Sequence, residues 1–273
     1  MEDFVVAFLG PPGTFCHQAA HERFGSSTSY KSCSTIRAVF EAVASRTVNF
    51  GVVPQENSFF GSVIETYDAF RDEQPGFVLD EIILPVQHCL LAPQGVKPSD
   101  IRRIQSHEQA IGQCRTFLSQ YFPSASLEKV SSTAAAAEAV LKHCDSAAIC
   151  SRICTVVFDG LQVLFQNIQD HQNNRTRFYV LAPDATSQLP LPRPISSKGL
   201  IRILPTDSRR IAMALATLSL PVSRIDRRPD TKSLEPFQDV YFVEVEETDV
   251  GEVVQGIQRL QSTKVEAKLL GLW

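Results

Sequence analysis

The sequence predicts an α/β protein of two lobes with a cleft between them, followed by a small ferredoxin-like domain. Apolar runs of strand length alternate with segments of helical period through residues 1–170, which is typical of parallel sheets covered by helices. The alternation falls into two blocks, 1–76 and 77–170, which favours two lobes. A stretch rich in Pro and Ser at 183–197 is typical of a linker, and a βαββαβ pattern follows it.

Composition narrows the class of protein. A chain of 273 residues suits about two domains, and a formal net charge of −4 without a basic block gives no sign of a nucleic-acid partner. The acidic first three residues and the short apolar run at 4–9 fit neither a signal peptide nor a membrane span, so we expect a cytoplasmic protein with no membrane partner. The seven cysteines show no C-x-x-C pair, which favours reduced, mostly buried thiols and no metal site.

The first block opens with a strand at 4–9, a glycine-rich turn at 10–13 and a helix at about 16–24. Thr14 is placed to cap that helix. A strand, a glycine turn and a helix start together present free backbone N–H groups to an anion, here near Gly13. No lysine follows Gly13, so the nucleotide-phosphate loop is absent. A tight turn without a ligand fits the same residues. His17, early in the helix, is expected on its surface or at a contact between lobes.

A second polar cluster follows the strand predicted at 48–53. Glu56, Asn57 and Ser58 bring a carboxylate, an amide and a hydroxyl to the C-terminal end of that strand. In open α/β sheets this is where ligands bind. Helices are predicted on either side, at 35–46 and 63–70.

The second block carries a third cluster at the start of a helix. Strands are predicted at 77–84, 85–92, 103–105, 127–130, 147–150 and within 161–168, with helices at 106–121, 132–143 and 151–158. Ser106 is the expected cap of the helix at 106–121, and His107 and Gln109 lie in its first turn.

Residues 170–181 open with polar residues and close on an apolar run. We interpret them as a loop that delivers Thr176 and Arg177 to the mouth of a strand at 176–182. A hydroxyl beside a guanidinium suits holding an anion and donating a hydrogen bond to it. An edge strand with a solvated start fits the same pattern.

The last part of the chain has enough apolar residues to form a core and few polar residues suited to catalysis. Strands are predicted at 199–204, 222–227, 240–246 and 265–272, with helices at 207–219 and 250–260. Such a unit suits regulation or dimerisation better than chemistry. The sequence therefore predicts domains at 1–185 and 198–273, with a linker at 186–197.

The polar clusters together resemble the prephenate dehydratase family. Their order and gaps are family-like, and the resemblance covers about residues 4–182. The matching segments are Gly-Pro-Pro-Gly-Thr-Phe at 10–15, His-Gln-Ala-Ala at 17–20, Gly-Val-Val-Pro at 51–54, Glu-Asn-Ser at 56–58, Gly-Ser-Val at 61–63, Ser-His at 106–107, Gln-Ala at 109–110, Gln-Cys at 113–114, Ala-Ala-Ile at 147–149, Ser151, Asn174 and Thr-Arg-Phe at 176–178.

The resemblance implies an activity and a fold. Members of the family convert prephenate to phenylpyruvate, water and carbon dioxide without a cofactor, on the way to phenylalanine. Their catalytic part resembles a two-lobed periplasmic binding protein whose last strand returns to the first lobe. Here that implies one lobe of 1–76 and 176–185 and another of 77–175. The tail looks like the ACT domain that usually follows, and a homodimer or higher homo-oligomer is expected.

The resemblance also implies roles for individual residues. Thr176 corresponds to the central catalytic group, and Asn57 and Gln109 are expected to line the cleft. Glu56 would serve as a proton source only where burial raises its pKa. Backbone N–H groups near Gly13 and Ser58 would hold a carboxylate. The further substrate contacts expected are Thr14, Ser58, Ser106, His107, Arg177 and Phe178. Arg177 in a structural salt bridge, and His107 as a support for its helix, are the alternatives.

The tail departs from the family pattern at both segments expected to touch an effector. A Gly-Ala-Leu segment is usual at the first strand-to-helix turn, where this chain has Pro-Thr-Asp-Ser-Arg at 205–209. Glu-Ser-Arg-Pro is usual on the second strand, where this chain has Asp226, Arg227, Arg228 and Pro229. The missing glycine removes a place where a ligand approaches the backbone closely. We therefore predict weak or altered inhibition by phenylalanine. The alternatives for the whole chain are arogenate as substrate, or a non-catalytic sensor that binds a small molecule.

Overall fold

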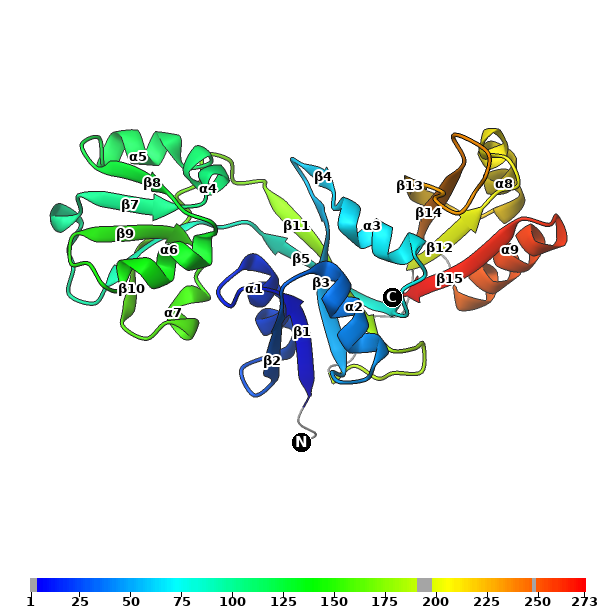
Figure 1. The fold of residues 1–273 in the computed structure, drawn as a ribbon, viewed down its shortest axis with the longest axis horizontal. Coiled ribbons are helices and arrows are strands. Elements are labelled where there is room, and N and C mark those ends of the chain that lie inside the picture. The colour runs from blue at the N-terminus through cyan, green and yellow to red at the C-terminus, as the bar shows by residue number, and fades with distance from the viewer. Residues whose placement is uncertain (1–3, 191–197, 247–248) are drawn as a thin grey trace.

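The computed structural model describes residues 4–190, 198–246 and 249–273. Figure 1 shows three bodies in a row: a lobe built on a small sheet, a lobe built on a large sheet, and a C-terminal domain. The chain starts in the central lobe, enters the small-sheet lobe, returns, and ends in the C-terminal domain. The two-lobed arrangement predicted from the sequence is confirmed.

The large-sheet lobe holds the first two polar clusters. Its strands are β1 (Val5–Leu9), β2 (Ser29–Cys33), β3 (Phe50–Asn57), β4 (Gly61–Ser62), β5 (Phe77–Pro85) and β11 (Arg175–Ala182), and its helices are α1 (Phe15–Phe24), α2 (Ile36–Ala44) and α3 (Ile64–Arg71). The strand order is β5-β11-β3-β1-β2. The strand β11 runs antiparallel to β3 and brings Thr176 opposite Asn57. Two side chains 119 residues apart in sequence therefore become neighbours.

The small-sheet lobe holds the third cluster. Its strands are β6 (Cys89–Pro93), β7 (Arg103–Ser106), β8 (Ser126–Lys129), β9 (Ser146–Cys150) and β10 (Leu161–Phe165), and its helices are η1 (Pro98–Asp100), α4 (Glu108–Gly112), α5 (Arg115–Tyr121), α6 (Thr133–Val140) and α7 (Cys154–Val157). The strand order is β10-β6-β9-β7-β8. The strand β9 is buried along its whole length, as its apolar sequence requires of a central strand.

The C-terminal domain has the predicted βαββαβ order. Its elements are β12 (Lys198–Leu204), η2 (Ser208–Arg210), α8 (Ile211–Leu218), β13 (Val222–Pro229), β14 (Asp239–Glu246), α9 (Val250–Ser262) and β15 (Glu266–Leu272). Its sheet continues the large sheet, because β15 pairs with β5 where Gly271 faces Val78. A Cβ at position 271 would lie 2.4 Å from the Val78 Cβ, so only glycine permits this approach.

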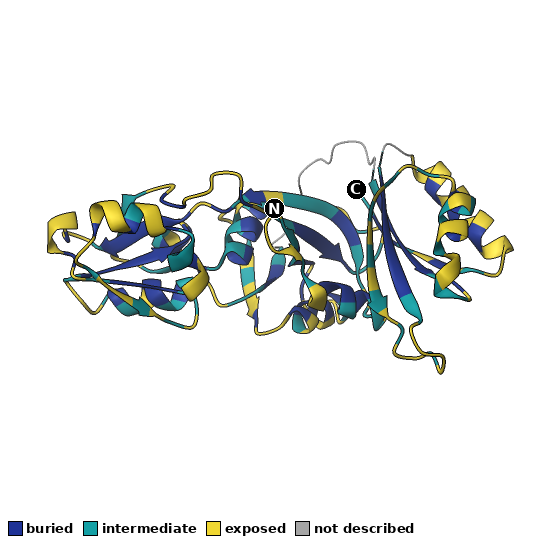
Figure 2. Ribbon diagram, turned by 90° about the horizontal axis from the view of Figure 1, so that it is seen from above, coloured by how far each residue is buried: buried dark blue, intermediate teal, exposed yellow. Residues whose placement is uncertain are grey.

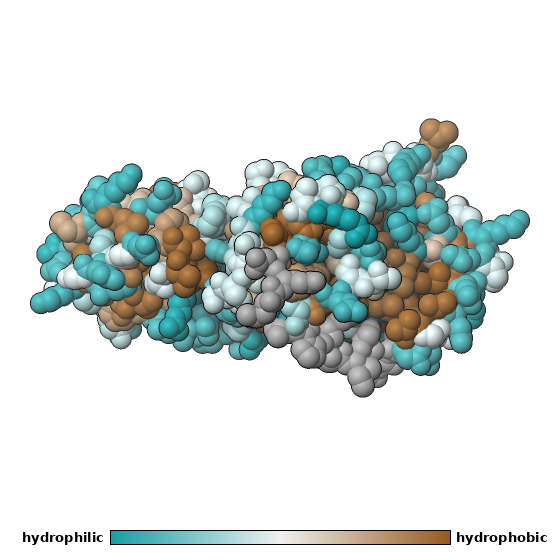
Figure 3. All heavy atoms as spheres, turned by 90° about the horizontal axis from the view of Figure 1, so that it is seen from below, coloured by the Kyte–Doolittle hydropathy of each residue, from teal (hydrophilic) through white to brown (hydrophobic). Residues whose placement is uncertain are grey.

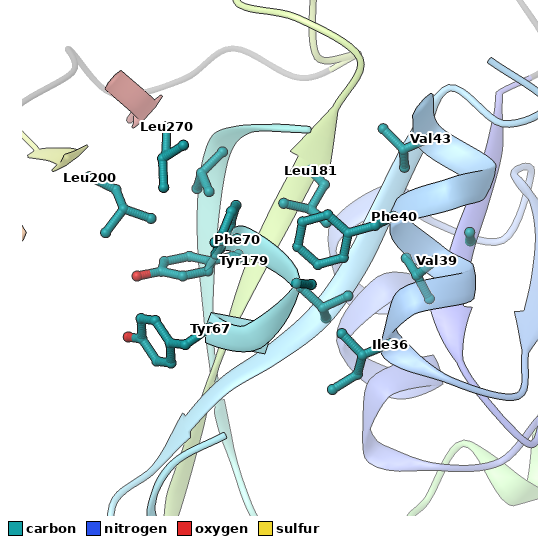
Figure 4. Packing of buried hydrophobic residues seen from close by; sticks show 14 of the residues in the cluster. Ile36, Val39, Phe40, Val43, Tyr67, Phe70, Tyr179, Leu181, Leu200 and Leu270 are labelled. Carbon is teal, nitrogen blue, oxygen red and sulfur yellow. The ribbon is translucent and has the colours of Figure 1, made fainter. Parts of the chain in front are cut away.

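The C-terminal domain and the large-sheet lobe share one hydrophobic core. Tyr67, Phe70 and Tyr179 of the lobe pack with Leu200 and Leu270 of the C-terminal sheet, as Figure 4 shows. The helices α8 and α9 cover the other face of that sheet. Figure 2 shows strands that are mostly buried and helices that carry many of the exposed residues. The two parts are therefore packed against each other as layers of one structure.

Several predictions about the fold are wrong. The strand β5 was expected in the second lobe, but it pairs along its length with β11 in the large sheet. Both sheets are mixed, whereas parallel sheets were expected, because β11, β6 and β10 pair antiparallel to their neighbours. The helix predicted at 106–121 is broken into α4 and α5, and β2 was not predicted. Residues 191–197 of the predicted linker lie outside the described residues.

The surface adds little to the functional argument. Figure 3 shows one face, on which hydrophobic side chains gather over the C-terminal domain at the right. Met213, Val250 and Val254 are among the large apolar side chains that this domain exposes.

Within the described residues, no helix has the length and apolar character required to span a membrane. All seven cysteines are free and six are buried, as predicted.

Candidate active site

The three polar clusters meet at one cavity between the two lobes. It has a volume of about 320 Å³. The large-sheet lobe contributes Thr14, Phe15, Asn57, Phe60 and Thr176, the small-sheet lobe contributes His107, Gln109, Ala110, Gln113, Ser131, Ser132 and Thr133, and the two segments that connect the lobes contribute Val86, His88 and Asn174. Asn57, Gln109 and Thr176, which the resemblance placed in the cleft, thus line the same cavity.

Asn57 is the centre of the hydrogen-bond network at the cavity wall. Its Nδ2 donates to Thr176 Oγ1 at 3.0 Å and to Asn174 Oδ1 at 2.8 Å. Its Oδ1 accepts the backbone N–H groups of Phe59 at 3.0 Å and Phe60 at 3.2 Å. Because the oxygen must face these two donors, the orientation of the amide is fixed. The Asn57 amide therefore presents its N–H groups to Thr176 and Asn174.

The hydroxyl of Thr176 is left as a donor. A hydroxyl carries one proton and can accept two hydrogen bonds. Thr176 Oγ1 accepts from Asn57, so its own proton is available for a group in the cavity. The side chain is partly exposed and is held on β11, which pairs with both β3 and β5. A donor on a rigid strand is oriented before any ligand arrives.

Two helix N-termini supply positive potential at the cavity. Thr14 caps α1, and Ser132 caps α6 by accepting from Ala135 N at 3.0 Å. Backbone N–H groups in the first turn of a helix, together with the helix dipole, favour an anion there. Within the part of the chain that the structure describes, no lysine or arginine lines the cavity. An anion in it would therefore be held by neutral donors and by these two helix starts.

The two backbone N–H groups named in the sequence analysis have other partners. The N–H of Gly13 donates to His17 Nδ1 at 3.2 Å, and that of Ser58 donates to the carbonyl of Arg175 at 2.9 Å. These two N–H groups are therefore not available to a carboxylate, and that role for the neighbouring N–H groups in the first turn of α1 stays a prediction. The turn at 10–13 and the residues after β3 satisfy their own backbone groups instead.

His107 and Gln109 reach the cavity from the start of α4. His107 is the residue that caps this helix, where Ser106 was expected, and its Nδ1 accepts from Gln109 N at 3.3 Å. The neutral ring then carries its proton on Nε2, which can donate. His107 therefore supports its helix and also lines the cavity, where its contact with a substrate stays a prediction.

His88 and Gln113 were not among the predicted site residues. The His88 ring lies 2.7 Å from Gln113, between Nε2 and Oε1. Burial lowers the pKa of His88, so the ring is neutral and Nε2–H donates to that oxygen. The Gln113 amide then has its N–H groups left to donate. Gln113 lies four residues after Gln109, and this spacing, which places both side chains on one helix face, could have predicted Gln113 as a site residue. A lone histidine in an apolar stretch, such as His88, has no comparable pattern.

Glu56, Arg177 and Phe178 do not line the cavity. Glu56 and Arg177 are directly adjacent to Asn57 and Thr176 on their strands, and successive side chains of a strand point to opposite faces. The Glu56 carboxylate forms an ion pair with Arg224 of the C-terminal domain. Arg177 pairs with Glu244 at 3.1 Å and with Glu81 at 3.4 Å, which is the structural alternative given above. Phe178 is buried in the core.

Ser106 and Ser58 are also absent from the cavity wall. The buried Ser106 hydroxyl donates to the carbonyl of Ile149 at 2.6 Å, and it thereby joins β7 to β9. Ser58 Oγ accepts from the backbone N–H of Arg175 at 3.0 Å. Both hydroxyls hold backbone in place, so the expectation that they touch a substrate is corrected.

The four predicted effector residues are occupied by ion pairs or lie on a separate cavity. Asp226 pairs with Arg224, Arg227 with Asp239, and Arg228 with Asp68. Arg227, Arg228 and Pro229 border a second cavity of about 620 Å³ at the connection between β13 and β14. Within residues 4–190, 198–246 and 249–273, no group of His, Cys, Asp and Glu is arranged to hold a metal ion.

The His17 side chain holds the turn at 10–13, which lies beside the cavity. It was expected on the helix surface or at a contact between lobes, but its side chain is buried and stacks on Phe8 with ring centroids 4.5 Å apart. Burial, aided by the neighbouring His21, lowers the pKa of His17 from 6.5 to about 4. The neutral ring accepts the N–H of Gly13.

We expect the stability to fall as the pH drops from 6.5 towards 4. In this range the unfolded chain binds a proton at His17 that the folded chain does not, while above pH 6.5 the contribution is fully present. The loss should be on the order of 1–3 kcal/mol. Denaturant unfolding of the parent and of His17→Gln at several pH values measures it, with the exposed His143→Gln as control. An equal pH slope in His17→Gln and the parent would contradict the assignment.

Comparisons with known proteins agree on one family. The family model described as prephenate dehydratase matches residues 6–186. A prephenate dehydratase of Bacillus subtilis is 31% identical over 98% of this chain and 98% of its own length. This chain also spans about half the length of the bifunctional chorismate mutase/prephenate dehydratases that it matches.

Two solved structures are similar over nearly the whole chain. A prephenate dehydratase from Arthrobacter aurescens, in complex with L-Phe, superposes with a TM-score of 0.80 at 27% identity, covering 98% of this chain and 89% of that one. GqqA, described as a quorum quenching acylase, also superposes with a TM-score of 0.80, at 26% identity and with coverage of 98% and 97%. The overall fold is therefore shared by proteins with different described activities.

Proposed function

The chain belongs to the prephenate dehydratase family, and from this premise we propose that it is a hydro-lyase that converts prephenate to phenylpyruvate, water and carbon dioxide. The observation that carries the proposal is the Asn57–Thr176 pair, which presents a free hydroxyl proton to a cavity lined by neutral donors. Similarity alone does not separate this activity from that of the acylase, whereas the groups that line the cavity favour the dehydratase reaction.

The reaction requires little more than a hydrogen-bond donor and a substrate that is held in one orientation. Prephenate carries two carboxylates and a ring hydroxyl. As one carboxylate leaves as carbon dioxide, its bonding electrons enter the ring, and the hydroxyl leaves with one proton from solvent as water. Aromatisation drives both departures. Thr176 has no pKa near neutrality, so it acts by donating a hydrogen bond to the departing oxygen, where negative charge develops.

The cavity also suits the charge of the substrate. The N-termini of α1 and α6 and the N–H groups of Gln109 and Gln113 favour two carboxylates without a fixed positive side chain. A lysine or arginine on the departing carboxylate would stabilise the ground state and oppose its loss. Holding the ring and both carboxylates in one pose can contribute about 7 kcal/mol to lowering the barrier.

The composition of the cavity wall favours prephenate over arogenate. Arogenate differs by an ammonium group, which needs a carboxylate or several acceptors when it is removed from water. Among the described residues that line the cavity there is no Asp or Glu. The keto group of prephenate instead accepts hydrogen bonds, which matches a wall of hydroxyls and amides.

The test is to incubate the purified protein with prephenate and with arogenate separately. We expect phenylpyruvate from prephenate at a kcat/KM well above that for phenylalanine from arogenate. The reverse preference would reassign the substrate. No turnover of either compound, by a protein whose circular dichroism shows it folded, would leave the sensor alternative.

Phenylalanine is expected to inhibit weakly or not at all. The charged side chains at 226, 227 and 228 are held in ion pairs, so an amino acid would have to displace them to bind there. The first strand-to-helix turn has no glycine. Titration of phenylalanine against the prephenate activity measures the effect, and strong inhibition at low micromolar effector would overturn the prediction. Tyrosine serves as the control ligand.

A further inference from the structure

The edge strand of the C-terminal sheet reaches the hairpin that carries Asn57. From β13, the Arg224 guanidinium forms an ion pair with Glu56 on β3 and donates from Nη2 to Ser62 Oγ on β4 at 2.8 Å. Asp226 completes the cluster, since it accepts from Arg224 Nε and from Ser62 Oγ, each at 2.5 Å. One side chain of the C-terminal domain thus holds both strands of the β3–β4 hairpin.

This hairpin forms part of the cavity wall. Glu56 pairs with Ser62 and Asn57 pairs with Gly61 across its two strands. The turn between them carries Phe60, which lines the cavity and whose N–H binds Asn57 Oδ1. The grip of Arg224 is therefore one residue from Asn57 along β3. A displacement of the hairpin would move the Asn57 amide away from Thr176.

The neighbouring strand β11 is also joined to the C-terminal domain by an ion pair. Arg177 follows Thr176 on β11 and pairs with Glu244 of β14. Alternation along β3 and β11 places Asn57 and Thr176 on the cavity side and Glu56 and Arg177 on the side of the C-terminal sheet. The cavity residues and the interdomain ion pairs are thus the two faces of the same strand segments.

Burial makes the Arg224–Glu56 pair costly to break. The two side chains are only 19% and 26% exposed. Removing Arg224 leaves both Glu56 and Asp226 partly buried without their counter-ion, which costs more than the pair itself is worth, whereas removing Glu56 leaves Arg224 paired with Asp226 alone. The hairpin would therefore shift to let the remaining charge reach water. Displacements of about 1 Å at a catalytic group can reduce turnover about 10²-fold.

We propose that Arg224 is a positioning residue for the prephenate reaction, which it serves by holding the β3–β4 hairpin so that Asn57 stays hydrogen-bonded to Thr176. The inference rests on the proposed function. It assigns to the C-terminal domain a part in completing the catalytic site, in the absence of any effector. It also gives Glu56 a role as the anchor of this contact in place of a proton source.

The variants Arg224→Gln, Glu56→Gln and their combination test the inference. Asp68→Asn is the matched control, because Asp68 pairs with Arg228 of the same strand but lies on α3, away from the hairpin. We expect kcat to fall at least ~10-fold in both single variants, with KM changed less than ~3-fold, since the lost positioning acts on the transition state. The double variant should be no slower than the slower single variant, because both remove one contact. Arg224→Lys should retain part of the activity.

A spectroscopic readout separates this inference from the proposed function. The side-chain amide resonances of Asn57 should move in Arg224→Gln and stay in place in Asp68→Asn, whether or not the protein accepts prephenate. Unmoved Asn57 resonances, or a kcat within ~2-fold of the parent in both single variants, would overturn the inference. A parent protein without prephenate turnover would refute the proposed function while leaving the resonance test decisive for Arg224.

Discussion

Thr176→Ala should fold like the parent and lose on the order of 10²–10⁴ in turnover. The hydroxyl is the only group at this position that can donate a hydrogen bond to the departing oxygen. Without this hydrogen bond the negative charge on the leaving hydroxide is not stabilised, and the activation barrier rises. Folding should be nearly unaffected, because Asn57 Nδ2 keeps its bonds to Asn174 Oδ1 and to the carbonyl of Arg175. The loss of one partly exposed hydrogen bond costs about 1 kcal/mol.

Two further substitutions at this position sharpen the test. Thr176→Val keeps the shape and removes the hydroxyl, so it should be as slow as Thr176→Ala. Thr176→Ser keeps the hydroxyl with more rotamer freedom, so it should retain part of the activity. Steady-state kinetics with prephenate and thermal unfolding measure both properties. Near-normal turnover in Thr176→Val would remove the hydroxyl from the mechanism.

Asn57→Asp is expected to lose on the order of 10²–10⁴ in kcat/KM and about 1–3 kcal/mol of stability, because a carboxylate oxygen would face the acceptor oxygens of Asn174 and Arg175. A carboxylate still accepts the N–H groups of Phe59 and Phe60, so the turn is preserved. It cannot donate to Thr176 or Asn174, and its charge repels a dianionic substrate. The substitution therefore keeps the turn while it removes the donor function and adds a negative charge.

Asn49→Asp is the matched control for this prediction. Asn49 is an exposed asparagine whose Oδ1 accepts the N–H of Val5 at 2.8 Å, so the same exchange adds the same charge away from the cavity. Its kinetics with prephenate should equal those of the parent. If Asn57→Asp also kept the parent's kcat/KM, the hydrogen bond from Asn57 to Thr176 would have no catalytic role.

The parts of the fold that the sequence predicted are those set by local patterns. Continuous apolar runs identified β1, β3 and β9, and helical spacing of apolar residues identified α2. The edge strand β2 carries mostly exposed polar residues, which left no strand signal. The place of β5 was missed for another reason: its main partner, β11, begins ninety residues after β5 ends. Such pairing is decided by packing, which no local pattern records.

The cavity residues also divide into those that a local motif predicts and those that depend on packing between distant segments. Asn57, Gln109, Thr176, Thr14 and His107 were placed there by motif and line it. Glu56 and Arg177 were expected beside them because they are adjacent in sequence, but adjacency along a strand means opposite faces. Their partners, Arg224 and Glu244, lie in the C-terminal domain, and no local pattern predicts that this domain packs so close to the cavity. His88 was missed because an isolated histidine in an apolar run has no distinguishing pattern.

The chain passes between the two lobes only at 86–88 and 166–174, within the residues that the structure describes. Val86, His88 and Asn174 belong to these passages and also line the cavity. The hinge about which the lobes would rotate is thus built from residues of the binding site itself. Any swing of one lobe would reorient Asn174 against Asn57 and would change the shape of the cavity floor. Substrate capture and interlobe bending should consequently be a single event, observable as a smaller radius of gyration in X-ray scattering when a substrate analogue binds.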